Sequence, residues 1–251
     1  GVSARIFHEG LDVLSANTEA TFLNLKSRKN RFPNSDRLSN HFSPHTIWTT
    51  TEFLFKKINE IERFSSPHLA ESPAETEFLK TGKGNIRQMK IRNNSLRKDW
   101  QPPGISPVRY FFRNNFATDW TLLVHMVQIE DSDWEILEQN KNKIAVCLCP
   151  ISNKNLNCGI APGREFLDRG FTVALGTDSA MSGESLDMLA VINSAMSDYG
   201  FSFEEALKCA TLGGAKALKF DDKIGSIEVG KEAQLLAFDG KKIEWLEGVG
   251  K

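Results

Sequence analysis

The chain has 251 residues, of which 40% are hydrophobic and 25% are charged, the proportions of an ordinary folded protein. Its formal net charge of -1 excludes a strong electrostatic attraction to nucleic acid or to an anionic membrane surface. No apolar run approaches the roughly 18 residues that a membrane-spanning helix needs. Four cysteines without a CxxC pair predict a cytoplasmic location. The start at Gly1, without an initiator methionine or a signal pattern, predicts a processed product or a fragment.

Short apolar runs alternate with longer helical patterns along the chain, which predicts a parallel α/β fold. Helices are predicted over residues 131–140, 162–169 and 206–218, and another follows a cap at residues 50–52. The predicted strands cover residues 4–7, 41–45, 66–70, 121–126, 144–149 and 171–176.

Residues 81–107 form a basic and polar stretch that has no clean helical or strand period and contains Pro102, Pro103 and several glycines. Because it is too long for an ordinary connection, we expect a functional loop or lid. A mobile, solvated insertion is an equally good interpretation.

The end of the chain changes from an α/β pattern to an all-β pattern. Predicted strands at residues 234–238 and 242–246 flank a turn signal at Asp239-Gly240. The change divides the chain into a first part, residues 1–220, and the edge of a small β domain, residues 221–251.

Histidine and acidic side chains follow the predicted strands. His45, His68 and His125 each lie where a strand ends, and Asp178 follows the last one. In a parallel barrel such ends open onto one face, where distant side chains meet. Imidazoles and a carboxylate there would hold a divalent ion that lowers the pKa of bound water to about 7, and a nearby glutamate would transfer protons.

Each of these residues also has a purely structural interpretation. His68 could cap the core while Glu71 begins a solvated helix, His125 could be a core histidine, and Asp178 could cap the next helix. Cys147 and Cys149 share one strand face, and packed core thiols are a better interpretation than a thiolate metal site.

Taken together, seven segments in order resemble the amidohydrolase superfamily, specifically the branch of cytosine, guanine and adenosine-type deaminases and chlorohydrolases. The resemblance implies a (β/α)8 barrel of the TIM type followed by a small β-sandwich segment. The segments are Ser43-Pro44-His45-Thr46, His68-Leu69-Ala70-Glu71-Ser72, Leu122-Leu123-Val124-His125, Cys149-Pro150-Ile151-Ser152-Asn153, Ala174-Leu175-Gly176-Thr177-Asp178-Ser179, Leu212-Gly213-Gly214-Ala215-Lys216-Ala217-Leu218 and Gly225-Ser226-Ile227-Glu228-Val229-Gly230-Lys231.

The resemblance also implies a role for each residue of the site. His68 is implied to bind the metal, and Asp178 both to bind it and to deprotonate the attacking water. Glu71 is implied to protonate a ring nitrogen of the substrate, and His125 to polarise the attacking hydroxide. The metal is expected to be zinc, with iron as the alternative, because two histidines and a carboxylate suit either ion.

Further residues are implied to contact the substrate, which would be a small nucleoside-like molecule. These are His45, Trp48, Ser179 and Ser182, together with Glu71 and the stretch from Cys149 to Asn153. An insertion over residues 100–107 is similar to that of enzymes that deaminate 6-aminodeoxyfutalosine, so an adenine-type nucleoside is expected. The resemblance also implies a homodimer.

One departure from the family is large: the chain has no His-x-His pair, which the family carries on its first barrel strand. We therefore expect an incomplete barrel, strands three to eight, that is inactive alone and binds metal weakly. A related chlorohydrolase or cyclic-amide hydrolase is the alternative activity. A truncated, non-catalytic paralogue that binds a partner through its open edges is the alternative of another class.

Overall fold

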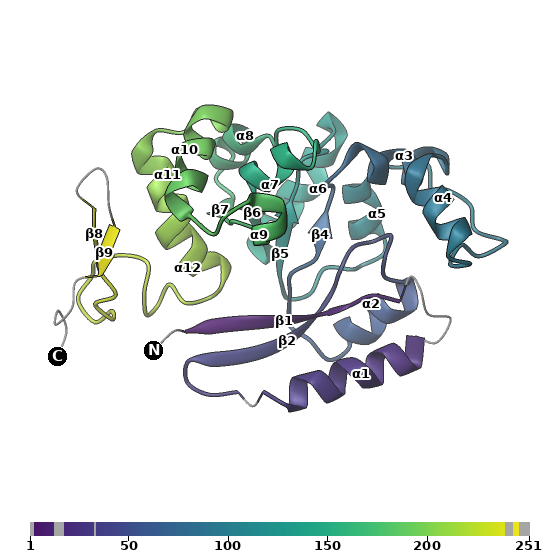
Figure 1. Cartoon of the computed structure of the whole chain (residues 1–251), viewed down its shortest axis with the longest axis horizontal. Helices are drawn as coiled ribbons and strands as arrows, with labels where there is room; N and C mark the ends of the chain where they lie inside the picture. Colours follow the sequence, from purple (N-terminus) through teal and green to yellow (C-terminus); the bar gives the residue numbers. More distant parts are fainter. Residues whose placement is uncertain (1–2, 13–17, 33, 239–242, 246–251) are drawn as a thin grey trace.

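The computed structural model describes residues 3–12, 18–32, 34–238 and 243–245, and its two larger sheets are parallel (Figure 1). Strand β1 (Ala4–Gly10) pairs along its whole length with β2 (Leu38–Pro44). The larger sheet contains β3 (Phe64–Ser65), β4 (His68–Leu69), β5 (Trp120–His125), β6 (Ile144–Leu148) and β7 (Thr172–Leu175). The predicted α/β class with a parallel sheet is thus confirmed.

The two parallel sheets meet where β2 ends. Thr46 forms an isolated parallel bridge with His68, and the His68 amide donates to the His45 carbonyl oxygen at 2.9 Å. The strand predicted over residues 66–70 is confirmed only at His68 and Leu69, which form β4; β3 lies before the predicted range, and both strands pair with β5. Pro67 lies in the break, and it has no amide hydrogen to donate to a strand ladder.

Two helices cover the outer side of the β1–β2 sheet, and Figure 1 shows them below it. They are α1 (Thr18–Asn30) and α2 (Glu52–Asn59). The predicted cap of α2 is confirmed, since the Thr51 side chain accepts from the Leu54 amide. The helices bury an apolar cluster against the sheet, made of Phe22, Leu25, Phe42, Leu54 and Ile58.

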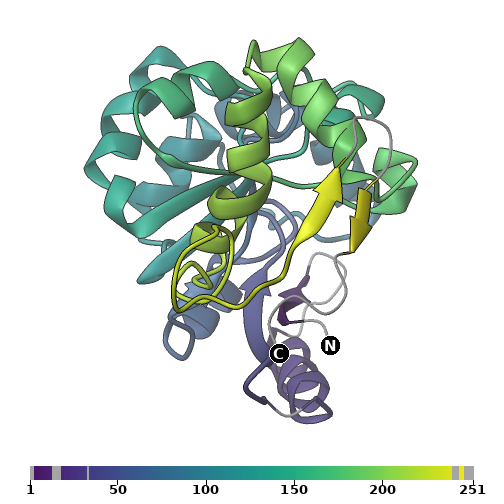
Figure 2. The ribbon, with the colours of Figure 1, turned by 90° about the vertical axis from the view of Figure 1, so that its left-hand side faces the viewer.

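Strands β6 and β7 of the larger sheet are mostly apolar, as in sheets that are covered on both faces. In β5, Leu122 packs with a small inner cluster around Phe64 and Ala174, whereas the neighbouring Leu123 packs with the main core. Figure 2 shows the surrounding helices as an arc, with α1 at the opposite end of the molecule. The helices are α3 (Pro73–Thr81), α5 (Pro107–Arg113), α6 (Trp134–Gln139), α7 (Pro150–Asn155), α8 (Gly163–Asp168), α9 (Ala180–Gly183), α10 (Met188–Tyr199), α11 (Phe203–Lys208) and α12 (Gly214–Ala217).

Residues 81–107 are more regular than predicted. Helix α4 (Gly84–Arg92) follows α3 directly, so the expectation of a stretch without regular structure is wrong there. The rest packs on α3: the Trp100 ring stacks on Phe78 with centroids 4.4 Å apart, and the Gly104 amide donates to the Leu79 carbonyl at 3.1 Å. A glycine at the first helical position and few apolar residues hide this helix from a sequence pattern.

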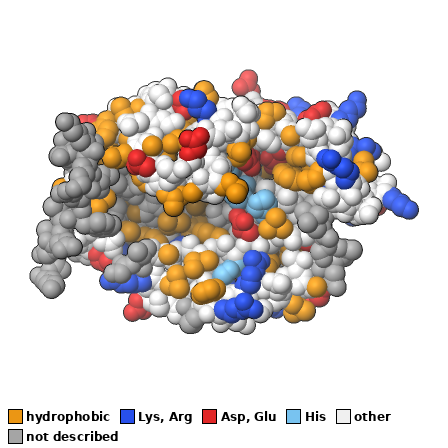
Figure 3. Space-filling view, in the orientation of Figure 1, with side chains coloured by type: hydrophobic (Ala, Val, Ile, Leu, Met, Phe, Trp, Pro, Cys, Tyr) orange, Lys and Arg blue, Asp and Glu red, His pale blue; other side chains and the backbone are white. Residues whose placement is uncertain are grey.

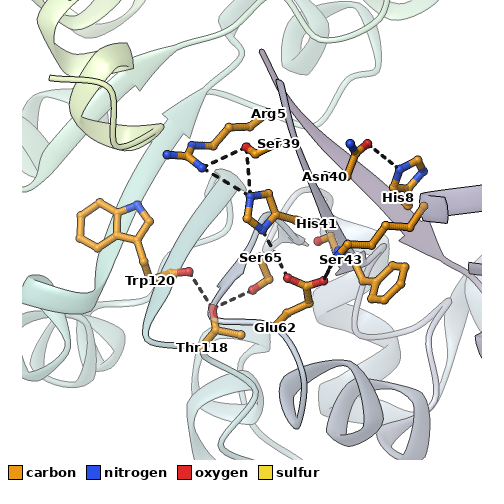
Figure 4. A network of polar contacts seen from close by, with 12 residues as sticks. Arg5, His8, Ser39, Asn40, His41, Ser43, Glu62, Ser65, Thr118 and Trp120 are labelled. Atoms are coloured by element: carbon orange, nitrogen blue, oxygen red, sulfur yellow. Dashed lines mark hydrogen bonds and ion pairs between the residues drawn. The ribbon is translucent and has the colours of Figure 1, made fainter. Parts of the chain in front are cut away.

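A polar network joins β1 and β2 to the far end of the chain (Figure 4). The Arg5 guanidinium donates to the Ser39 hydroxyl at 3.0 Å and to the backbone carbonyl of Leu218, which follows α12. The buried Glu62 carboxylate accepts from the Phe42 amide at 3.0 Å and contacts His41 at 3.3 Å. The network thereby ties the β1–β2 sheet to a segment more than 200 residues away along the chain.

The predicted C-terminal strands are confirmed as β8 (Leu236–Phe238) and β9 (Ile243–Trp245), which pair antiparallel. Their predicted turn at Asp239-Gly240 lies outside the described residues. In the described part of the chain, no helix combines the length and apolar character needed to cross a membrane.

Gly213 and Gly214 make a matched pair for testing how α12 packs on β7. A Cβ on Gly213, the last residue of the π-helical turn Cys209–Gly213, would lie 2.1 Å from the Val173 carbonyl oxygen. A Cβ on Gly214 would approach nothing closer than the Cys209 carbonyl oxygen at 4.0 Å.

We expect Gly213→Ala to lower the free energy of unfolding by about 2–3 kcal/mol, because helix and strand must separate. Gly214→Ala should be neutral or stabilising by up to about 1 kcal/mol. Urea denaturation of both variants measures the difference, and equal stabilities would contradict the packing described here.

Candidate functional site

The strand ends bring three histidines together at one end of the larger sheet. His45 follows β2, His68 begins β4 and His125 ends β5. The His45 and His68 rings lie 4.9 Å apart between centroids, and the His68 and His125 rings 5.3 Å apart. The Glu71 carboxylate oxygen Oε1 lies 3.8 Å from His125 Nε2. The structure therefore places these predicted site residues side by side.

The His68 ring is oriented by the backbone of the preceding strand end. Its Nδ1 lies 3.2 Å from the His45 carbonyl oxygen. A carbonyl oxygen can only accept, so this contact places the proton on Nδ1 and leaves the Nε2 lone pair free. This is the arrangement found around metal-binding histidines.

His125 is oriented in the same way by a side chain after β6. Its Nδ1 lies 2.8 Å from the Asn153 side-chain oxygen, which again places the proton on Nδ1. Burial lowers the pKa of His125, although the Asn153 contact and the Asp178 charge oppose the shift. The His125 ring is therefore neutral, and its Nε2 faces Glu71.

Several site residues adopt a left-handed backbone that side chains other than glycine rarely take. These are Ala70 (φ 52°), His125 (φ 76°), Met126 (φ 49°) and Asp178 (φ 57°). The turns are held by neighbouring hydrogen bonds, including one from the Gln128 amide to the Ala70 carbonyl at 2.7 Å. Strain of this kind concentrates at functional sites, and here it is found at the ends of β4, β5 and β7.

Glu71 rests on a second, fully buried glutamate. The Glu71 amide donates to Glu75 Oε2 at 2.8 Å, and Glu75 Oε1 has no hydrogen-bond partner in the described part of the chain. Burial raises the pKa of Glu75 to about 8. Burial also raises the pKa of Glu71, and the Asp178 charge adds to that shift while His68 opposes it.

Asp178, which follows β7, accepts hydrogen bonds from two serines. Ser152 donates to Oδ2 at 2.5 Å and Ser182 to the same atom at 2.8 Å. Burial alone would raise the pKa of Asp178, but these hydrogen bonds hold it below its ordinary value. Of the two serines predicted to bind substrate, Ser182 thus contacts Asp178, whereas the exposed Ser179 caps α9 and contacts the Ser182 hydroxyl at 3.1 Å.

Glu9 joins the histidines, although the sequence analysis did not single it out. Glu9, His45 and His68 each place one ligand atom so that all three atoms lie within 4.8 Å of one another. Burial and the neighbouring histidines lower the pKa of His45 to about 4. A neutral imidazole can bind a metal ion. In the sequence, the one feature that could have pointed to Glu9 is its position near the end of a predicted strand.

The two strand cysteines are packed thiols beside the site. Gly176 leaves room for them, since a Cβ there would lie 2.8 Å from Cys147 Sγ and 3.3 Å from Cys149 Sγ. A hydrogen bond with Cys147, together with burial, raises the pKa of the Cys149 thiol. A protonated, buried thiol fits the packing interpretation better than a metal-binding thiolate.

Comparisons with known proteins agree with the fold. The amidohydrolase family matches residues 14–251, so the chain belongs to the amidohydrolase family, as predicted.

The curated relatives are nucleoside deaminases. A 5-methylthioadenosine/S-adenosylhomocysteine deaminase of Thermoanaerobacter pseudethanolicus is 32% identical over 208 residues, 78% of this chain and 43% of that protein. The same enzyme of Caldanaerobacter subterraneus subsp. tengcongensis is 39% identical over 147 residues, 55% of this chain and 34% of that protein. The chain therefore spans less than half the length of these relatives.

Solved structures of related enzymes share the fold. An aminofutalosine deaminase of Helicobacter pylori superposes with a TM-score of 0.76 at 20% identity, over 92% of this chain and 59% of that one. An adenosine deaminase of Xanthomonas campestris with bound zinc superposes with a TM-score of 0.74 at 24% identity, over 93% of this chain and 52% of that one. At these identities the likeness concerns the fold.

The buried Glu75 gives the site a testable pH dependence. Its pKa rises from an ordinary 4.5 to about 8 on folding, so between these values the folded state binds more protons than the unfolded state. The stabilisation is complete below pH 4.5 and is lost as the pH rises through 8. Glu75→Gln lacks this titration.

We therefore expect wild type to lose stability relative to Glu75→Gln by up to about 1.4 kcal/mol per pH unit between pH 5 and 8. Denaturant unfolding at several pH values measures it. Glu77→Gln, an exposed change on the same helix, should follow the wild-type profile. If the difference in the free energy of unfolding between wild type and Glu75→Gln did not change with pH, the buried Glu75 carboxyl would not be neutral in the folded protein.

Proposed function

We propose that this chain is part of a hydrolytic deaminase and that the substrate of this enzyme is an adenine-type nucleoside. The observation that carries the proposal is the meeting of His68, Glu71 and His125, with the serine-held Asp178 after β7, which lies beyond β6 in the same sheet. The relatives named 5-methylthioadenosine/S-adenosylhomocysteine deaminases support a nucleoside substrate. The insertion over residues 100–107, together with the fold of the aminofutalosine deaminase, supports 6-aminodeoxyfutalosine as the specific substrate.

The strands of this chain would be numbers three to eight of a (β/α)8 barrel, followed by the start of a β-sandwich. Strands β1 and β7 would then be the open edges of the barrel. Residues 1–220 would form the barrel part of the chain, and residues 221–251 the start of the β-sandwich. In support, the face between the β1–β2 sheet and the larger sheet is hollowed and lined by hydrophobic side chains, with histidine and acidic groups beside it (Figure 3). Two further strands, one of them with a His-x-His pair, would close such a barrel.

The residues present fit a divalent ion such as zinc. His45, His68 and Glu9 offer imidazole and carboxylate donors whose ligand atoms lie within 4.8 Å of one another, and zinc and iron both accept such donors. Asp178 keeps Oδ1 for a metal or a proton, because both serines bond to Oδ2. A bound ion would supply Lewis acidity and lower the pKa of the attacking water.

The side chains divide the proton transfers of a deamination. Asp178, ionised at neutral pH, takes a proton from the water that adds to the ring carbon. Glu71, whose pKa is raised, donates a proton to the ring nitrogen. The neutral His125 offers Nε2 to orient the water. Asp178 then passes the proton that it took to the amino group, which leaves as ammonia when the carbon–nitrogen bond breaks. The new hydroxyl becomes a carbonyl and returns a proton to Glu71, so one water is consumed for each ammonia released.

The raised pKa of Glu71 favours deamination over the alternative hydrolysis of chloride or of a cyclic amide. A ring nitrogen must be protonated before ammonia leaves an adenine ring, and a carboxyl with a raised pKa suits that step. A non-catalytic paralogue would have no need for the strained turns at Ala70, His125 and Asp178.

Zinc titration by calorimetry tests the metal assignment. We expect one weak site, with a dissociation constant no tighter than about 1 µM, because the chain lacks the His-x-His ligands. His68→Ala should weaken binding at least about tenfold, and Glu9→Gln should weaken it less.

Glu77→Gln, an exposed acid on α3, is the control and should bind zinc like wild type. If His68→Ala bound zinc as tightly as wild type, the metal site would not lie at His68. Tight, stoichiometric binding by wild type would overturn the requirement for additional ligands.

Ammonia release from a panel of adenosine derivatives tests the activity. The chain alone should release ammonia at least about a thousandfold more slowly than a complete deaminase, because one end of the metal site is open. It should still bind adenine nucleosides, and Glu71→Gln should weaken that binding. Full activity would contradict the incomplete barrel, and binding that is indifferent to Glu71 would contradict the nucleoside site.

A further inference from the structure

A cavity of about 1060 Å³ lies between the α3–α4 turn, helix α4 and the segment that follows this helix. All of its wall residues lie between residues 81 and 102, and none of them belongs to the proposed deaminase site. Trp48, which the sequence analysis assigned to substrate binding, packs against the main core after β2 and does not line this cavity. The proposed deaminase chemistry therefore leaves the cavity unexplained.

The stretch that builds the cavity is strongly basic. Residues 81–107 contain six Lys and Arg residues and a single acidic residue, Asp99, so they carry a net charge of +5 in a chain whose net charge is -1. Several of the Lys and Arg side chains of the molecule lie at the end that α3 and α4 form (Figure 3). The positive charge of the chain is thus concentrated around this cavity.

Four of these cations line the cavity: Lys83, Arg87, Arg97 and Lys98. No acidic side chain is among its wall residues. Within the described ranges, the side chains of Lys83, Arg87 and Lys98 have neither an ion pair nor a hydrogen bond. Arg97 donates to Asp99 through Nε at 3.1 Å and Nη2 at 2.6 Å, which leaves its Nη1 for another acceptor. Neighbouring residues therefore neutralise little of the charge on the wall.

The first turn of α4 adds to this positive charge. A helix begins with unpaired backbone amides and a partial positive charge, which hydroxyl or acidic side chains usually offset. In α4 the N-cap is Lys83, whose side chain makes no capping hydrogen bond, and the first turn contains no acidic residue. Glu77 of α3 lies against Gly84, but it does not line the cavity. An anion bound in the cavity would offset the unfavourable placement of Lys83.

The remaining wall offers an apolar, aromatic surface. The half-buried Trp100 ring lines the cavity and stacks in parallel on Phe78 of α3, with centroids 4.4 Å apart. Leu96 and the exposed Ile91 line the same cavity. A fixed aromatic ring with apolar neighbours favours a planar ligand body. The cavity thus combines a cluster of cations with a surface on which a flat ring can pack.

We infer that this cavity binds a nucleoside triphosphate, at a place separate from the proposed deaminase site. The phosphates would pair with Lys83, Arg87 and Lys98, and the base would pack on Trp100. Arginine binds phosphate oxygens in pairs through its planar fork, and lysine contributes a compact positive charge. Inorganic tripolyphosphate has the same charged groups without a ring, so it would occupy the basic part of the cavity alone.

Calorimetry on the full chain, without divalent metal, compares ATP with tripolyphosphate. We expect wild type to bind ATP with a dissociation constant of about 10–100 µM, and tripolyphosphate about tenfold more weakly because it lacks the base. Raising the salt concentration from about 0.05 to 0.5 M should weaken both ligands at least about tenfold, because salt screens exposed charges.

The double variant Lys83→Met with Arg87→Met should weaken both ligands at least about tenfold. The matched control, Arg31→Met with Lys143→Met, removes the same charge from two exposed residues that do not line the cavity, and it should bind both ligands like wild type. Trp100→Leu should weaken ATP alone. Retained tripolyphosphate binding would show that the cavity of this variant is still formed.

Glu71→Gln separates the two proposals, because it alters the deaminase site and should leave ATP binding unchanged. If Glu71→Gln weakened ATP binding, the nucleotide would occupy the deaminase site and the inference would be overturned. Absence of ATP binding, or ATP binding that the Lys83 and Arg87 changes leave intact, would overturn it as well. An unchanged preference for ATP over tripolyphosphate in Trp100→Leu would contradict the packing of the base on Trp100. None of these results bears on the proposed deaminase activity.

Discussion

The site depends on the parallel alignment of β2, β4 and β5. The hydrogen bond from the His68 amide to the His45 carbonyl, at 2.9 Å, fixes where β4 lies against the end of β2, and the pairing of His68 with Val124 fixes it against β5. Because strand side chains alternate with a period of two, a slip by one residue would turn His68 to the other face. The three histidines meet only in this register.

The surroundings of two carboxyl groups of the site shift their pKa values in opposite directions. Asp178 has two serine donors on one oxygen and a pKa below its ordinary value, whereas Glu71 is desolvated near that negative charge and its pKa is raised. Paired groups whose pKa values are pushed apart can serve as base and acid in one reaction. The buried Glu75 supports this division, because it holds the Glu71 amide in place.

Part of this arrangement could be predicted from the sequence, because His125 and Asp178 each follow an apolar run that is typical of a buried strand, whereas no such run precedes His68. Glu9 could not, since its relevance arises from β1 pairing with β2, a contact across more than 30 residues. The strand β3 at Phe64 and Ser65 was not predicted, because the serines and Pro67 that separate it from β4 give no apolar pattern. Helix α4 was missed because tertiary contacts of the segment that follows it, such as the stacking of Trp100 on Phe78, stabilise the region more than its own composition does.

The claim on which everything else rests is that His45, His68, His125 and the acidic groups form one site able to hold a metal. A diffraction experiment at the zinc absorption edge, on crystals of the chain soaked in zinc, tests it most directly. The account predicts an anomalous peak about 2.0–2.1 Å from His68 Nε2, with a carboxylate or a second imidazole as its neighbour. Zinc bound only at distant surface acids, or imidazoles too far apart to share an ion, would contradict it.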